Sequence, residues 1–191
     1  AEHQLEELLK AVALSDNAAE LALDCFWQGS PVHCKSWGEL RTLADRAMST
    51  AFALTPKTAE EIMKSTKKND GLKAARRVVV DKLLDARGLR ALVDEKDQAQ
   101  ARLVRLLQTF DMLKTPKPQV GRPDPEKNPG AAAVWDYLQD FADELRDAPK
   151  EAQELVRSLR SAPYGLGERV LPLVVAAALR DRLRSGNIVA E

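Results

Sequence analysis

A cluster of basic residues is the feature of this sequence with the clearest chemical use. The stretch "KSTKKNDGLKAARR" holds one acid, Asp70, and six cations. The cations are Lys64, Lys67, Lys68, Lys73, Arg76 and Arg77. Contacts to phosphate need local positive charge, and each contact adds salt-dependent affinity. We therefore take this 64–77 cluster as the candidate nucleic-acid-binding site. An acidic protein surface and an ordinary solvated helix face are the alternatives.

Because the whole chain has no net charge, binding to an anionic partner would require such a local patch. The 29 Lys and Arg balance the 29 Asp and Glu, so the formal net charge is zero. The chain as a whole therefore attracts neither nucleic acid nor acidic lipid. A second basic set, interspersed with acids, lies in the C-terminal part and comprises Arg157, Arg160, Arg169, Arg180, Arg182 and Arg184.

Three residues near the N-terminus carry soft metal ligands: Cys25, His33 and Cys34. Zinc sites usually have CxxC-type spacing and four ligands, and here the fourth is missing unless His3 folds over. A free cysteine on a helix beside a His–Cys pair in a loop is the favoured interpretation, with no metal. Two cysteines form no disulfide framework, which favours the reducing cytoplasm.

The residues of a catalytic site do not come together in this sequence. His3 and His33 are the only histidines, and most carboxylates lie three or four residues from a cation, as Asp81 does from Arg77. That spacing is typical of a solvated helix face. The "GLG" at Gly165–Gly167 matches neither a dinucleotide loop nor a P-loop. We expect no cofactor and no active site in this chain, while the enzymatic status of a larger parent stays open.

The elements that would position these residues are helices. Only 5% of the chain is aromatic and 9 residues are glycine, while good helix formers abound. Residues 1–114 are predicted to form a helical domain. Its expected helices cover 2–14, 17–27, 36–52, 55–65, 69–88 and 95–113, with "GSPVHCK" (29–35) as a loop. Ser36 and Glu39 form a capping-box pattern, Thr55 with Pro56 marks another helix start, and Asn69–Gly71 reads as a turn.

Residues 115–130, "TPKPQVGRPDPEKNPG", contain five of the ten prolines. This density blocks both helix and sheet and predicts a linker or an extended surface loop, where we place a domain boundary. Residues 131–191 then run helix, helix, turn, helix, and a strand beginning at "GNIVAE". This order is that of a winged-helix-like module, with most of the wing beyond Glu191. The expected fold class is all-α, mainly a helical bundle, with a C-terminal winged-helix-like module.

The apolar run Val170–Leu179 is the most hydrophobic stretch of the chain. It is ten residues long and closed by Arg169 and Arg180, whereas a membrane-spanning helix needs roughly 20 residues. We expect a buried core helix with Pro172 in its first turn, where the amides have no intrahelical acceptor to lose, and no membrane contact. Tyr164 is expected to anchor the preceding turn.

Two stretches carry a resemblance to one family. The first is "LTPKTAEEIMKSTKKNDGLKAARRVVVDKLLDA" and the second is "AAAVWDYLQDFADELRDAPKEAQELVRSLRSAPYGLGERVLPLVVAAAL". They resemble successive segments of large P-loop ATPases of bacterial phage-defence systems, the BREX-type group and its relatives. The matched positions are Thr55, Pro56, Glu61, Ile62, Ala75 and Arg76, then Val134, Trp135, Asp136, Pro163, Tyr164, Gly165, Leu166, Leu171, Pro172 and Leu173.

The resemblance implies an ATPase parent that acts in defence against foreign DNA, with its nucleotide site outside this chain. The leading hypothesis is a non-catalytic helical accessory region that binds DNA or docks other domains or subunits of a defence complex. The alternative is a pure protein-interaction scaffold with no nucleic-acid role.

Overall fold

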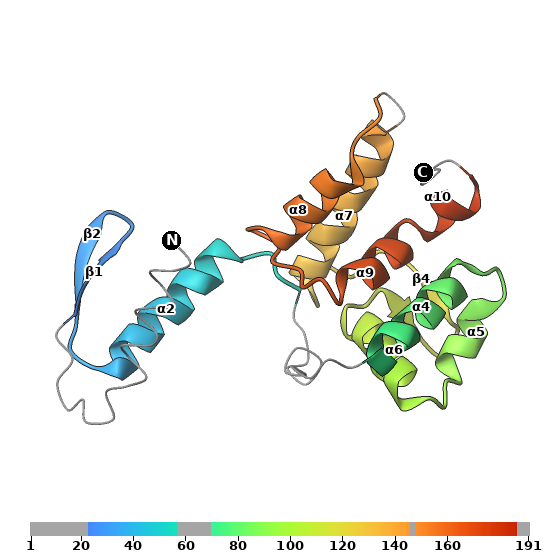
Figure 1. The fold of residues 1–191 in the computed structure, drawn as a ribbon, viewed down its shortest axis with the longest axis horizontal. Helices are drawn as coiled ribbons and strands as arrows, with labels where there is room; N and C mark the ends of the chain where they lie inside the picture. Colours follow the sequence, from blue (N-terminus) through green and yellow to red (C-terminus); the bar gives the residue numbers. More distant parts are fainter. Residues whose placement is uncertain (1–22, 57–69, 146–147, 187–191) are drawn as a thin grey trace. The chain divides into compact units, whose positions relative to one another are not determined.

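The computed structural model describes residues 23–56, 70–145 and 148–186 (Figure 1). The chain divides into two compact units, Ala1–Ala51 and Phe52–Glu191. Within the described residues it is mainly helical, with eight helices and four short strands. The predicted mainly helical character is thus confirmed, whereas the four strands depart from an all-α fold. The predicted boundary at 115–130 lies inside the second unit, where buried residues on both sides of it join one core cluster.

The described part of the first unit begins with a β-hairpin. Strands β1 (Leu23–Trp27) and β2 (Ser30–Cys34) pair antiparallel. Gln28 and Gly29 join them with φ values of 51° and 79°, the two positive angles of a tight hairpin turn. The helix predicted to end at Trp27 and the loop predicted over 29–35 are therefore wrong for these residues. Cross-strand pairing formed by the tight turn outweighs the helical preference of the Ala- and Leu-rich stretch.

Helix α2 (Trp37–Ala51) follows the hairpin and has the predicted cap. The Glu39 amide donates to Ser36 Oγ at 3.2 Å, and the Glu39 carboxylate accepts from the Lys35 amide at 2.7 Å. The helix predicted over 55–65 falls mainly in residues 57–69, outside the described residues.

The second unit opens with α4 (Asp70–Leu84), α5 (Gly88–Val93) and α6 (Gln98–Thr109). Helices α4 and α6 match predicted helices, whereas α5 was not anticipated. Helix α4 already includes Asp70 and Gly71, so the turn predicted there is wrong for these two residues. The Asp97 carboxylate caps α6 by accepting from the Gln100 amide at 2.9 Å.

The proline-rich segment is an ordered surface loop. Strands β3 (Leu113–Lys114) and β4 (Gln119–Val120) form a small hairpin within and beside it. Arg122 then forms two 2.7 Å hydrogen bonds with the Asp136 carboxylate, and this pairing lowers the pKa of Asp136. The buried Asn128 ends the loop, because its side-chain oxygen caps the next helix at the Ala131 amide.

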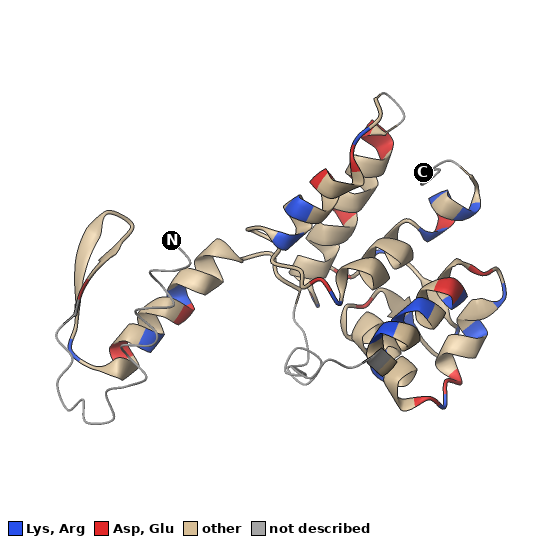
Figure 2. Cartoon of the chain, viewed as in Figure 1, with Lys and Arg blue, Asp and Glu red and all other residues tan. Residues whose placement is uncertain are grey.

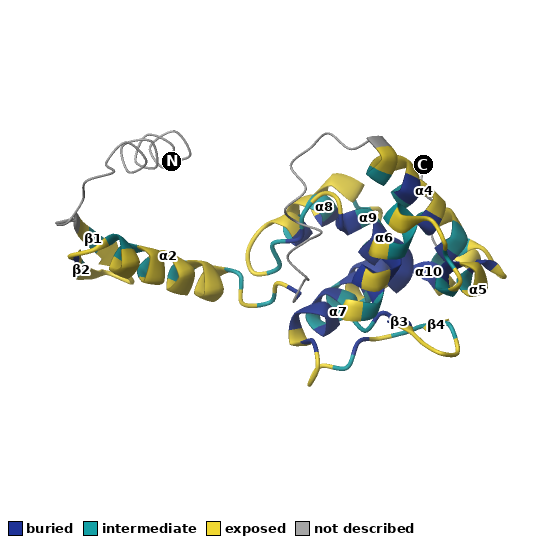
Figure 3. Cartoon of the chain, turned by 90° about the horizontal axis from the view of Figure 1, so that it is seen from below, coloured by how far each residue is buried: buried dark blue, intermediate teal, exposed yellow. Residues whose placement is uncertain are grey.

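The remaining helices are α7 (Pro129–Glu144), α8 (Ala152–Arg160), α9 (Leu171–Ala178) and α10 (Arg180–Arg184). Helix α9 packs against α4 and α7, and Figure 3 shows it mostly buried. The buried helix predicted from the apolar run is thus confirmed. None of the described helices is both long and apolar enough to cross a membrane. Most of the strand predicted at 186–191 lies outside the described residues.

The turn between α8 and α9 is held by aromatic packing. The ring of Tyr164 lies 5.2 Å from that of Tyr137 on α7, as the predicted anchoring role requires. Gly165 has φ of +61°, a conformation that glycine adopts without strain. The Leu54 amide donates to the Pro163 carbonyl at 3.1 Å, so residues 52–56 pack against this turn.

Candidate functional site

The described half of the 64–77 cluster lies on α4. Lys64, Lys67 and Lys68 fall outside the described residues. Lys73, Arg76 and Arg77 are within two turns of each other and share one side of the helix. Ala75, Val79 and Leu83 repeat every four residues and are buried, so the core fixes which side of α4 the cations occupy. Figure 2 shows Lys and Arg, in blue, along the first half of α4.

Arg76 links the 64–77 cluster to the second basic set. Its Nη1 donates to the backbone carbonyl of Arg169 at 3.4 Å, across 93 positions of sequence. Arg76 is half-buried, whereas Lys73 and Arg77 are exposed. The turn that precedes α9 therefore lies against the N-terminal half of α4.

A hollow of about 310 Å³ opens at this contact. Lys73, Arg76 and Arg169 line it together with Glu168, Leu72 and Leu103. We call this the α4–α9 hollow. Three cations and one carboxylate give its lining a formal charge of +2. Arg and Lys side chains at such a site can hold a phosphate group, with Arg forming paired hydrogen bonds and Lys acting as a point charge.

The lining of the α4–α9 hollow suits the binding of an anion. Glu168 is its single carboxylate, and it contains no His, Cys, Ser or Thr to act as nucleophile or general base. The arrangement offers positive charge and two leucines. It can attract an anion.

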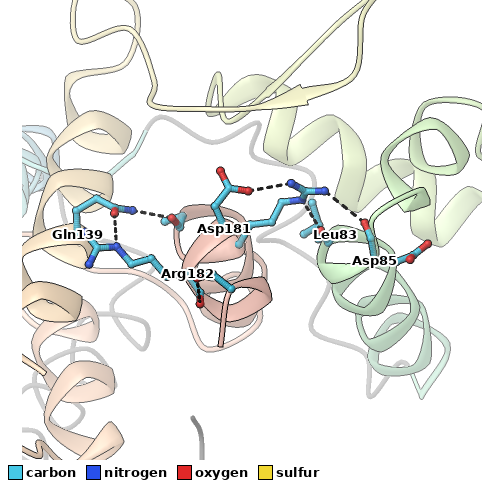
Figure 4. A network of polar contacts seen from close by, with 8 residues as sticks. Leu83, Asp85, Gln139, Asp181 and Arg182 are labelled. Atoms are coloured by element: carbon cyan, nitrogen blue, oxygen red, sulfur yellow. Dashed lines mark hydrogen bonds and ion pairs between the residues drawn. The ribbon is translucent and has the colours of Figure 1, made fainter. Parts of the chain in front are cut away.

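Two arginines of the second basic set form hydrogen bonds with other helices, and Figure 4 shows the polar network around Arg182. Arg180 is only 9% exposed and donates to the carbonyls of Leu83 and Asp85 at 2.7 and 3.3 Å. Arg182 forms two hydrogen bonds with Asp143, at 2.6 and 3.0 Å, and this pairing raises the pKa of Arg182. It also donates to Gln139, whose amide in turn donates to the Ala178 carbonyl.

The pleat of the first hairpin separates His33 from Cys25 and Cys34, the three candidate soft ligands. In its register Asp24 pairs with His33, whereas Cys25 and Cys34 belong to pairs on the opposite face. His33 Nδ1 lies 2.7 Å from Asp24 Oδ1. Burial, and then the neighbouring Cys25, raise the pKa of the Cys34 thiol. No group of three or more His, Cys, Asp or Glu suited to a metal occurs among the described residues.

The sequence pointed to Lys73, Arg76 and Arg77 but not to their neighbours at the hollow. Glu168, Leu72 and Leu103 carry no local signal, because only the packing of α4, α6 and the α9 turn brings them together. No protein-family model matches the chain, and no curated protein or solved structure matches it either.

Proposed function

We propose that this chain is a non-catalytic helical accessory region of a large cytoplasmic ATPase of bacterial antiviral defence, and that it binds DNA. The ATPase parent rests on the sequence resemblance. The DNA contact rests on one observation: cations from two distant segments, Lys73 and Arg76 with Arg169, line the same hollow. A positively charged hollow without a catalytic group fits a phosphate of the DNA backbone.

The C-terminal part is proposed to be winged-helix-like. The order of α7, α8 and α9 supports this proposal, because the second and third helices are joined by a turn that contains Pro163 and Gly165. An experimental structure of a longer chain tests it. A β-hairpin directly after α10 is expected, and a further helix at that place contradicts it.

Salt-dependent DNA binding tests the proposed contact. In the variant Lys73→Gln/Arg76→Gln/Arg77→Gln, losing up to three phosphate contacts should reduce the slope of log affinity against log salt by about 2–3. Fluorescence anisotropy of a labelled duplex across a salt series measures this slope. A matched control, Lys96→Gln/Arg105→Gln/Lys114→Gln, removes the same charge from exposed positions of the second unit.

The two variants separate a local contact from general electrostatics. An unchanged slope in the Lys73 variant, or an equal loss in both variants, contradicts the DNA proposal. Far-UV circular dichroism of each variant ensures that folded proteins are compared.

Exposed apolar side chains in the first unit favour the protein-interaction scaffold as a second candidate. Phe26 is 78% exposed and Met48 is 58% exposed, and exposed apolar groups often mark binding surfaces when they are contiguous. Under this candidate the chain is not retained on immobilised DNA at moderate salt. Replacing Phe26 by Ser then weakens binding to a partner protein.

A further inference from the structure

A second basic hollow lies at the opposite end of α4, where no sequence pattern pointed to a site. It is a groove of about 770 Å³ between the start of α5 and the loop of the β3–β4 hairpin. Its cations are Arg87 and Arg90 from α5 and its N-cap, and Lys117 from the hairpin loop. Leu89, Pro116 and Pro118 supply apolar surface. We call it the α5–hairpin groove.

The backbone on both sides of the α5–hairpin groove is held in place. Gly88 packs so closely on α4 that an added Cβ would lie 2.1 Å from the Lys82 carbonyl oxygen. Arg180 holds the Asp85 carbonyl, just after α4. On the other side, the Leu113–Val120 pair closes the hairpin. Because the walls are already ordered, a ligand need not organise them on binding.

The charges of this groove are uncompensated. Its lining holds three cations and no acid. Among the described residues, Arg87, Arg90 and Lys117 have no side-chain hydrogen bond or ion pair, whereas Lys82, Arg122 and Arg182 are paired with carboxylates. Three neighbouring cations with no acid create a local field that attracts an anionic partner.

The apolar residues of the lining favour an acidic peptide over single-stranded nucleic acid as the anionic partner. Proteins that hold single-stranded nucleic acid usually stack its bases on aromatic rings, and no aromatic side chain lines this groove. Leu89, Pro116 and Pro118 instead offer aliphatic surface, which suits apolar side chains. An extended peptide points alternate side chains to opposite sides. Because each wall of the groove carries both cations and apolar residues, each side of such a peptide needs acids as well as apolar residues.

We propose that the α5–hairpin groove docks an extended, acidic segment of a partner protein that carries Asp or Glu together with apolar residues on both of its sides. Its acids pair with Arg87, Arg90 and Lys117, and its apolar side chains cover Leu89 and the two prolines. This docking does not depend on the proposed DNA contact, which involves the N-terminal half of α4.

Peptide binding to the full chain tests the proposal. The probe is a fluorescent peptide of about ten residues in which pairs of Asp or Glu alternate with pairs of Leu or Phe, so that each side of the extended peptide carries both kinds. Two control peptides replace either the acids by Asn and Gln or the apolar residues by Gly. The acidic–apolar peptide should bind, and the variant Arg87→Gln/Arg90→Gln should weaken its binding about tenfold or more. The matched variant Arg102→Gln/Arg105→Gln, on exposed α6 positions, should stay within about twofold of the unchanged chain.

Each of the following results overturns the proposal. One is no binding of the acidic–apolar peptide, or equal binding to all variants. Another is equal binding of the Gly-containing control peptide, which removes the role of the apolar surface. A further one is that a single-stranded oligonucleotide binds the unchanged chain, and that the Arg87 variant weakens its binding as much as it weakens peptide binding. Nucleic acid is then the occupant of the groove.

The test also separates this proposal from the DNA proposal. The Lys73→Gln/Arg76→Gln/Arg77→Gln variant should bind the peptide as the unchanged chain does, whereas the Arg87 variant should keep its duplex DNA affinity. A second variant, Lys117→Gln, removes the cation on the hairpin side of the groove and should also weaken peptide binding. Unchanged peptide binding in Lys117→Gln contradicts a role for the hairpin side.

Discussion

Arg180 joins the end of α4 to the C-terminal helices. Its guanidinium donates to the carbonyls of Leu83 and Asp85. The last carbonyls of a helix lack amide partners of their own, and a cation at this end is stabilised by the helix dipole. Burial of the charged group is tolerated because these carbonyls and Asp181 accept its hydrogen bonds. The Arg180 side chain therefore orients helices rather than contacting a phosphate.

Substitution of Arg180 tests this role. Arg180→Met keeps much of the apolar stem but leaves the Leu83 and Asp85 carbonyls without a donor, so the free energy of unfolding should fall by about 2 kcal/mol. Arg184→Met on the same helix removes an exposed charge and should change it by less than about 0.5 kcal/mol. Urea unfolding measures both. Equal stability of the two variants would contradict the structural role of Arg180.

At the scale of elements, residues 52–56 and the α8–α9 turn show why a short segment can be ordered without secondary structure. The Leu54 amide bonds to Pro163, and Thr55 lies against two glycines. A Cβ at Gly130 would meet the Thr55 carbonyl at 2.7 Å, and one at Gly165 would meet the Phe52 ring at 2.7 Å. Thr55 and Gly165 therefore both contribute to this contact.

Gly130→Ala should loosen this packing. Alanine favours the helix by up to about 1 kcal/mol, but the clash with the Thr55 backbone costs about 1–3 kcal/mol and should prevail. Residues 52–56 must then shift, so the Leu54 amide should exchange hydrogen faster. Hydrogen-exchange mass spectrometry measures this, with Gly121→Ala as control, because an added Cβ there meets nothing within 4 Å. Unchanged exchange at Leu54 would contradict the close packing.

Other elements show which local sequence signals are sufficient to predict a helix or a strand. The apolar residues of α4 and α9 and the Ser36–Glu39 cap predicted helices that the structure contains. The β1–β2 hairpin was missed because each strand is only five residues long and β1 follows an Ala- and Leu-rich stretch that favours helix. The signal that could have found it is the Gln28–Gly29 pair at a two-residue turn.

For the whole molecule, the large buried cluster found among the described residues belongs to the second unit. Every residue of its buried cluster lies between Ala75 and Leu179. The cluster includes residues of α4, α6, α7 and α9, so the proline-rich segment spans one core. This organisation predicts that the second unit folds without residues 1–51.

A chain that begins at Phe52 tests this prediction. Its unfolding midpoint should equal that of the second unit in the full chain, because the buried cluster is retained. Trp135 is the only tryptophan of the shortened chain. Its fluorescence can be compared with that of a full-length Trp27→Phe/Trp37→Phe variant. A midpoint lower by several degrees would show that residues 1–51 stabilise the second unit.

Sequence patterns alone were enough to predict the helical character, the buried apolar helix before Arg180 and three cations on one side of α4. These features depend on residues within a few positions of each other, through helix hydrogen bonds and apolar periodicity. Helix packing brings Arg76 to Arg169, buries Arg180 and lets Arg87 and Arg90 line one groove with Lys117, and the sequence predicted none of this. Those pairs join residues far apart in the chain, so their positions follow from how the helices pack and not from local spacing.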